Sequence, residues 1–192
     1  MNVGKSSQPK ATQTRESSVE LVSPEILDSR PVSAAVKYWW KLRAGRCFPM
    51  RNELSPREMV PFLRNLVVIR IIDEGKDYEY RIVGDAFVQA LGMNFRGLRL
   101  TEVEVADPAY GLATRAAYEH VRTTTQPFAL RGWVSPSVPS LFSYHETAFL
   151  PLGDKDEIDH ILVASSFTPR AIYGEEQQEL GRVLPQSWNS SI

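Results

Sequence analysis

Five extended runs, two before a long helix and three after it, constrain the fold of this chain most. The first two runs, at residues 66–72 and 78–84, are rich in β-branched and aromatic residues, and the charged segment 73–77 joins them. Such a pair predicts a β-hairpin. The three later runs cover residues 128–134, 141–150 and 158–167. Strands grouped in this way are typical of an antiparallel sheet.

The helix between the two groups of strands is predicted from its own first residues. Asp107 can cap the backbone amides of the first turn, Pro108 suits that turn, and the helical pattern continues to Arg122. We expect His120 to lie on the side that faces the sheet, together with the apolar stripe of Ala109, Leu112, Ala113, Ala116 and Val121. These elements predict an α+β fold, a five-stranded antiparallel sheet with helices on one face.

Composition divides the chain into four parts. Residues 1–31 form an arm that we expect to be disordered, because its first twenty residues are polar and offer little apolar surface to offset the entropy of ordering. Residues 32–64 form an N-terminal helical extension, residues 65–169 the core, and residues 170–192 a tail.

The helical extension carries its own start and stop signals. Its first helix is predicted to close near Ala44 and Gly45, where glycine can act as a cap. A second, short helix is predicted to start with Ser55 as the N-cap, Pro56 in the first turn and Glu58 placed to close a capping box.

The order of elements and several short motifs resemble the PAS domain, in particular the PAS-like family common in alphaproteobacterial proteins. The resemblance spans residues 38–169, and the residues that carry it are Trp40, Leu42, Arg43, Gly45, Arg46, Pro49, Arg51, Pro56, Leu63, Leu66, Tyr80, Arg81, Ile82, Val83, Gly84, Gly92, Gly97, Pro151 and Leu152. It implies a PAS fold. Counted along the chain, the strands should then lie in the order second, first, fifth, fourth, third.

The resemblance also implies a function. PAS domains similar to this one bind proteins or small molecules, pass the result to an effector and are seldom enzymes. The segment after Phe167 has no effector pattern. We therefore expect a stand-alone sensor or protein-docking module in bacterial signalling, with a homodimer or a signalling protein as its partner. The alternatives are a small enzyme or ligand carrier on a similar cone-shaped α+β fold, and a structural adaptor with a filled core.

A PAS fold forms its ligand pocket between the sheet and the long helix. The residues that we expect to line this pocket are Tyr80, Ile82, Ala113, Ala116, His120, Trp133 and Phe149. Some haem-binding PAS proteins place a histidine on this helix, but His120 can equally bond to a carbonyl near the helix end. We expect no haem, flavin or other cofactor.

Two adjacent tryptophans, Trp39 and Trp40, are the candidate interface. Neighbours on one helix point to different sides, and each indole offers a large apolar area. We expect this helix to make a homodimer or partner contact. The alternative is that one tryptophan packs on the sheet and the other lies on a loop of the domain itself.

Three further residues have a structural and a functional interpretation. Arg81 could pair with Glu79 or Glu146, which we favour over anion binding. Arg51 precedes a helix cap, where it could tie down a loop or contact a partner. Cys47 has arginine neighbours that would activate a thiol, but no base is placed beside it, so we expect it to be inert.

Composition excludes several classes of function. Lys and Arg number 22 against 23 Asp and Glu, a formal charge of −1, so no basic field attracts nucleic acid. One cysteine and three scattered histidines make no zinc site. The chain has no signal-peptide core and no long apolar run, so we expect a cytoplasmic protein away from membranes. No nucleophile elbow or phosphate loop indicates an enzyme.

Overall fold

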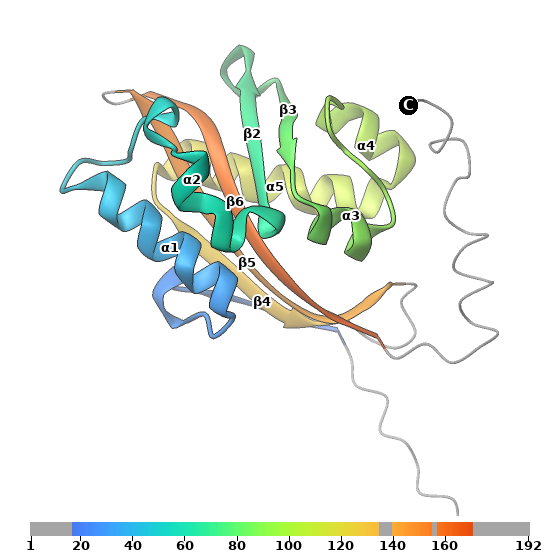
Figure 1. Ribbon diagram of the computed structural model, residues 1–192. Coiled ribbons are helices and arrows are strands. Elements are labelled where there is room, and N and C mark those ends of the chain that lie inside the picture. Colours follow the sequence, from blue (N-terminus) through green and yellow to red (C-terminus); the bar gives the residue numbers. More distant parts are fainter. Residues whose placement is uncertain (1–16, 135–139, 155–156, 171–192) are drawn as a thin grey trace, which may run out of the picture.

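The computed structural model describes residues 17–134, 140–154 and 157–170 (Figure 1). In these residues six strands form one sheet, in the order β1-β4-β5-β6-β2-β3, and every pair is antiparallel. The strands are β1 (Ser18–Val22), β2 (Leu66–Ile72), β3 (Asp77–Val83), β4 (Phe128–Trp133), β5 (Phe142–Asp154) and β6 (Glu157–Pro169). The predicted order of the five later strands is confirmed.

The sixth strand corrects the expectation that residues 1–31 are a disordered arm and that the sheet has five strands. β1 lies inside that range and pairs with β4 from Ser18 opposite Trp133 to Val22 opposite Ala129. Residues 18–21 alternate polar and apolar side chains, which is a strand pattern too short to show in the composition of the whole arm. Residues 1–16 lie outside the described part.

The helices cover both faces of the sheet, whereas one covered face was expected. On one side lie η1 (Pro24–Ile26), α1 (Arg30–Arg43), η2 (Arg51–Glu53), α2 (Pro56–Met59) and η3 (Val60–Asn65). On the other lie α3 (Asp85–Leu91), α4 (Leu100–Ala106) and α5 (Pro108–Thr124). The short η4 (Asp73–Gly75) joins β2 to β3. Figure 1 shows α1 and α2 in front of the sheet and α5 behind it. In the described residues, no helix is long and apolar enough to cross a membrane.

Helix α5 begins where predicted but turns a different side to the sheet. The side chain of Asp107 accepts a hydrogen bond from the amide of Tyr110 at 3.1 Å. Its buried residues are Gly111, Ala117, Tyr118 and Val121, while Leu112, Ala113, Ala116 and His120 are exposed. The prediction counted alanines as the apolar stripe, but burying a tyrosine ring removes far more apolar area from water, so the large rings set the rotation.

Helix α4, which the sequence analysis did not predict, packs on α5 at Gly111. A Cβ on Gly111 would lie 2.7 Å from the Cα of Glu104, so the glycine allows the two helices to approach. Arg115 and Glu104 then join the helices through two contacts of 2.5 and 3.0 Å.

Helix α2 starts at Pro56 as predicted, but the predicted capping box is wrong. The side chain of Ser55 makes no cap bond. Glu58 instead pairs with Lys41 at 2.7 Å, which ties α2 to α1.

Helix α1 is fixed to the sheet by Trp39. This side chain is fully buried, and its indole N–H donates to the carbonyl of Pro151 on β5 at 2.8 Å. Trp40 is half-buried against the same core, and its indole nitrogen is buried without a hydrogen-bond partner in the described residues. A side chain with no exposed area cannot form an interface, so the interface prediction is wrong for Trp39.

The adjacent tryptophans offer a matched test of this anchoring. Trp39→Phe should lower the free energy of unfolding by about 1–3 kcal/mol more than Trp40→Phe, because only the first leaves a buried carbonyl without its donor. Urea unfolding of both variants measures the difference. Equal losses would contradict the anchoring role of Trp39.

Candidate ligand site and docking surfaces

The layer between the sheet and α5 is filled with aromatic rings. Phe95, from the segment between α3 and α4, stacks between Tyr80 of β3 and Tyr110 of α5, with centroids 5.3 and 5.8 Å apart. Phe128 and Phe149 stack at 4.7 Å beside them. These rings occupy the space that the alanine stripe was expected to leave open.

Three tyrosine hydroxyls lie within this apolar layer. Burial, followed by the neighbouring Tyr118 and Tyr110, raises the pKa of Tyr80 far above its ordinary value. Burial also raises the pKa of Tyr110 and Tyr118, so all three phenols are neutral. The Tyr80 hydroxyl is buried, and no described group forms a hydrogen bond with it at ordinary geometry, although the hydroxyls of Tyr110 and Tyr118 lie close enough to affect its pKa. A buried polar atom of this kind marks a place for a small polar molecule or a water.

Tyr78, next to this group, has a fully formed network. Its hydroxyl donates to Glu119, which also binds Arg122 at 2.8 Å. Burial favours the neutral form of Glu119, but the hydrogen bonds from Arg122 and Tyr78 outweigh it and hold the pKa of this carboxyl below its ordinary value.

The two buried carboxylates of the described residues accept hydrogen bonds at the N-terminal ends of helices. Asp77 accepts bonds from the amide and hydroxyl of Thr101, at 3.3 and 2.9 Å, in the first turn of α4. Glu146 accepts from the amide of Ser29, at 2.8 Å, just before α1. A negative charge at a helix N-terminus is stabilising, so both groups have structural roles.

The predicted pocket residues are only partly brought together. Tyr80 and Phe149 are buried in the layer beneath α5. Ala113 and Ala116 are exposed, and the exposed His120 sets its ring edge-on to Phe128 at 4.7 Å.

Ile82 and Trp133 also lie elsewhere. Ile82 packs toward α1, because the register shifts between Val68 and Ile69 and leaves Arg81 as the extra residue, which turns Ile82 to the opposite face. Trp133 is 37% exposed on β4 and packs beside Tyr144 at 4.8 Å. Both placements correct the predicted pocket.

The motif residues of the resemblance have structural roles where the structure describes their contacts. Arg81 pairs with Glu79 at 2.8 Å, as one of the two predicted partners. Gly84 precedes α3, and a Cβ there would lie 2.3 Å from the carbonyl oxygen of Arg64. No larger residue fits without moving backbone. Arg51 and Pro56 are exposed at the starts of η2 and α2.

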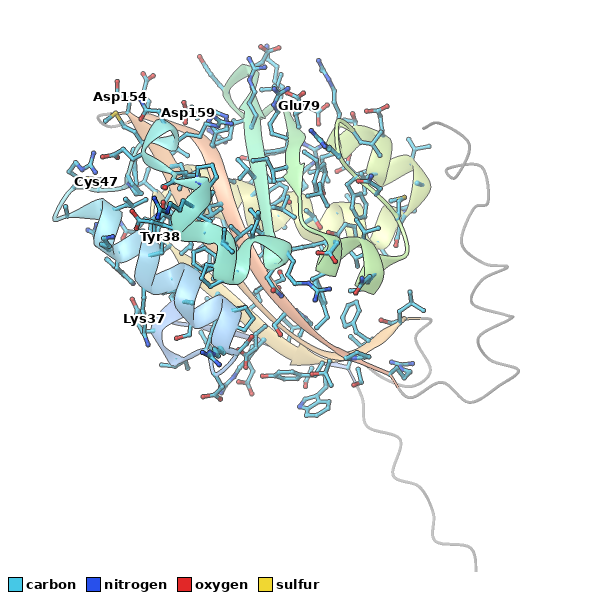
Figure 2. The ribbon with its side chains drawn as sticks, in the orientation of Figure 1. Lys37, Tyr38, Cys47, Glu79, Asp154 and Asp159 are labelled. Atoms are coloured by element: carbon cyan, nitrogen blue, oxygen red, sulfur yellow. The ribbon has the colours of Figure 1, made fainter. Side chains whose placement is uncertain are left out.

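Cys47 is exposed in the loop beyond α1, where Figure 2 labels it. Arg46, its neighbour, forms an ion pair with Glu53 at 2.9 Å. Among the described residues, no group of three or more His, Cys, Asp or Glu side chains is placed to hold a metal ion.

Two hollows among the described residues lie on the surface, away from the space beneath α5. One, of about 180 Å³, lies where β1, β4 and β5 run side by side, and Arg131, Trp133 and Tyr144 line it. The other, of about 270 Å³, lies between α3 and the ends of β5 and β6, beside Phe142 and Phe167. Sequence analysis missed the first hollow because it depends on β1, which was not predicted.

Matched tyrosine variants test the unpartnered hydroxyl. Tyr78→Phe should destabilise the protein by about 1–2 kcal/mol, because Glu119 loses a donor, whereas Tyr80→Phe should be neutral or slightly stabilising. Thermal unfolding of the two variants gives the comparison. A loss for Tyr80→Phe as large as that for Tyr78→Phe would show that its hydroxyl has a partner in solution.

His145 gives a prediction for pH. Burial lowers its pKa from the ordinary 6.5, although the charge of Glu146 opposes the shift. As the pH falls, the unfolded chain therefore takes up this proton at a higher pH than the folded chain. The contribution of His145 to the free energy of unfolding should be fully present above pH 6.5 and should decrease as the pH drops below it. His145→Gln should lose less stability than the wild type between pH 7.5 and 5.5 in urea unfolding. Identical losses would contradict the burial effect.

Comparison with known proteins gives one match. A protein-family model described as a PAS domain matches residues 27–159, which include α1 and the strands from β2 to β5. No curated protein and no solved structure matches the chain significantly.

Proposed function

Since the chain belongs to the PAS domain family, with more than half of its length matched, we propose that it is a protein-docking module in bacterial signalling. It acts in the cytoplasm, is not an enzyme and passes its signal through protein contacts. The observation that carries this proposal is the stack of Tyr80, Phe95 and Tyr110, which fills the layer where a PAS ligand would lie.

The middle ring of that stack is held by its backbone. The amide of Gly97 donates to the carbonyl of Tyr80 at 2.8 Å, and the amide of Tyr80 donates to the carbonyl of Leu98 at 3.0 Å. The segment that carries Phe95 is therefore bonded to β3 next to the ring that Phe95 covers. A ligand would have to displace Phe95 against these bonds, which favours a closed interior.

The polar groups also favour docking over catalysis. General acid–base chemistry needs a carboxylate or imidazole within reach of a substrate. Asp77 and Glu146, the buried carboxylates of the described residues, are bonded to helix starts, and the phenols beneath α5 are neutral at ordinary pH. This arrangement supports binding rather than proton transfer.

A second candidate function is small-molecule sensing in the same layer. The buried hydroxyl of Tyr80, without a partner in the described residues, favours it. A ligand there would be small and uncharged, would bond to the phenols and would push Phe95 aside. Charged ligands are disfavoured because the surrounding rings would desolvate them.

Native mass spectrometry of freshly purified protein separates the two functions. A docking module with a filled interior should give the mass of one bare chain or of two, with no mass per chain beyond that of the denatured chain except bound solvent. A stoichiometric added mass that denaturation releases would contradict the proposal. If Tyr80→Phe then lost that mass and Tyr78→Phe kept it, the sensing function would replace the docking function.

A further inference from the structure

The two margins of the sheet are treated differently. At the β3 margin, residues 97–99 cover the edge through the bridge between Glu79 and Arg99 and through the two bonds of Tyr80. At the opposite margin, β1 pairs with β4 on one side, and no described strand pairs with its other side. An open edge presents backbone donors and acceptors to any further strand.

The β1 edge lacks the features that usually protect such margins. Its register with β4 is regular over all five residues, and its sequence contains neither proline nor lysine. Its one charge, Glu20, is held by Arg131 of the same chain at 3.1 Å. Val19 and Leu21 are 60% and 66% exposed. The edge is regular, apolar and electrically neutral.

Both faces of this margin have the composition of an interface. Val19 and Leu21 share one face with Leu130, which lies opposite Leu21. On the other face lies the hollow lined by Arg131, Trp133 and Tyr144. Trp, Tyr and Arg are the residues most enriched where protein interfaces gain their binding energy.

We infer that β1 pairs antiparallel with β1 of a second copy of this chain, so that two sheets join into one across a two-fold axis. The inference rests on the proposed docking function and names its partner. A strand edge is self-complementary under a two-fold axis perpendicular to the sheet, because each copy offers the same row of donors and acceptors.

The symmetry also decides which side chains meet. A two-fold axis perpendicular to the sheet keeps each face on its own side, so Val19 and Leu21 of both copies form one apolar patch in any register. On the opposite face each copy brings Glu20 already paired with Arg131, so the approach of two copies adds no net charge. The contact therefore buries no charged side chain of β1 without a partner.

The size of the contact sets its strength. A stable interface buries about 800 Å² on each partner, and an edge of five residues supplies less. The dimer is therefore weak and depends on concentration. This agrees with a signalling contact that forms and dissociates.

Sedimentation velocity of the full chain over a range of concentrations tests the inference. The test variant is Val19→Lys with Leu21→Lys, and the matched control is Val105→Lys with Leu112→Lys, which changes two exposed apolar residues on α4 and α5. The wild type and the control should approach twice the monomer mass as concentration rises. The edge variant should be largely monomeric at the concentrations where the wild type dimerises, because its dissociation constant is raised about tenfold or more.

Other outcomes overturn the inference in distinguishable ways. A wild type that is monomeric throughout removes the homodimer and leaves docking to another protein as the proposed function. An edge variant that dimerises like the wild type excludes β1. Loss of the dimer in the control variant would place the interface on α4 and α5. Loss of the dimer in Trp40→Ala alone would place it on α1.

Hydrogen exchange of the wild type gives a readout that needs no variant. Amides of residues 18–22 should exchange more slowly at high than at low protein concentration, since pairing with a second copy protects them. Exchange of these amides that does not change with concentration, while the mass doubles, would overturn pairing through β1.

Discussion

The rest of the structure depends on one constraint, which is that the β5–β6 ladder is apolar on both faces. Leu150, Leu152 and Leu162 point to one side, while Phe149, Ile161 and Val163 point to the other, and all six are buried. Each such side chain contributes about 1.5–3 kcal/mol when it leaves water, so neither face can stay bare. Helices from before and after the β2–β3 hairpin are therefore both needed, α1 for one face and α5 for the other, and α1 is part of the packed domain.

The two layers solve this constraint with different chemistry, and the difference bears on function. Beneath α1 the core is mainly aliphatic, with Trp39 bonded to Pro151 as its fixed point. Beneath α5 it is aromatic, with the phenols of Tyr80 and Tyr118 among the rings. In the second layer the rings of Tyr80, Phe95 and Tyr110 stack on one another. Our proposal therefore places recognition at the surface, where no described strand pairs with the outer side of β1 and residues 97–99 cover the β3 margin.

Sequence patterns predicted what local chemistry determines and failed where packing decides. The cap of Asp107 and the pair of Arg81 with Glu79 depend on a few neighbouring residues, whereas the strand order was implied by the resemblance to the PAS domain. The rotation of α5 depends on which rings reach the sheet, and the face of Ile82 depends on a bulge at Arg81 that no periodicity reveals. Gly84 is required by the Arg64 carbonyl, a contact that a single sequence cannot show.

The most direct test of the central claim is a high-resolution crystal structure of the freshly purified chain, examined between the sheet and α5. The account predicts Phe95 stacked between Tyr80 and Tyr110, with no density for a bound molecule beyond water near the Tyr80 hydroxyl. Density for an organic molecule at that hydroxyl, with the Phe95 ring turned away from Tyr80, would contradict it.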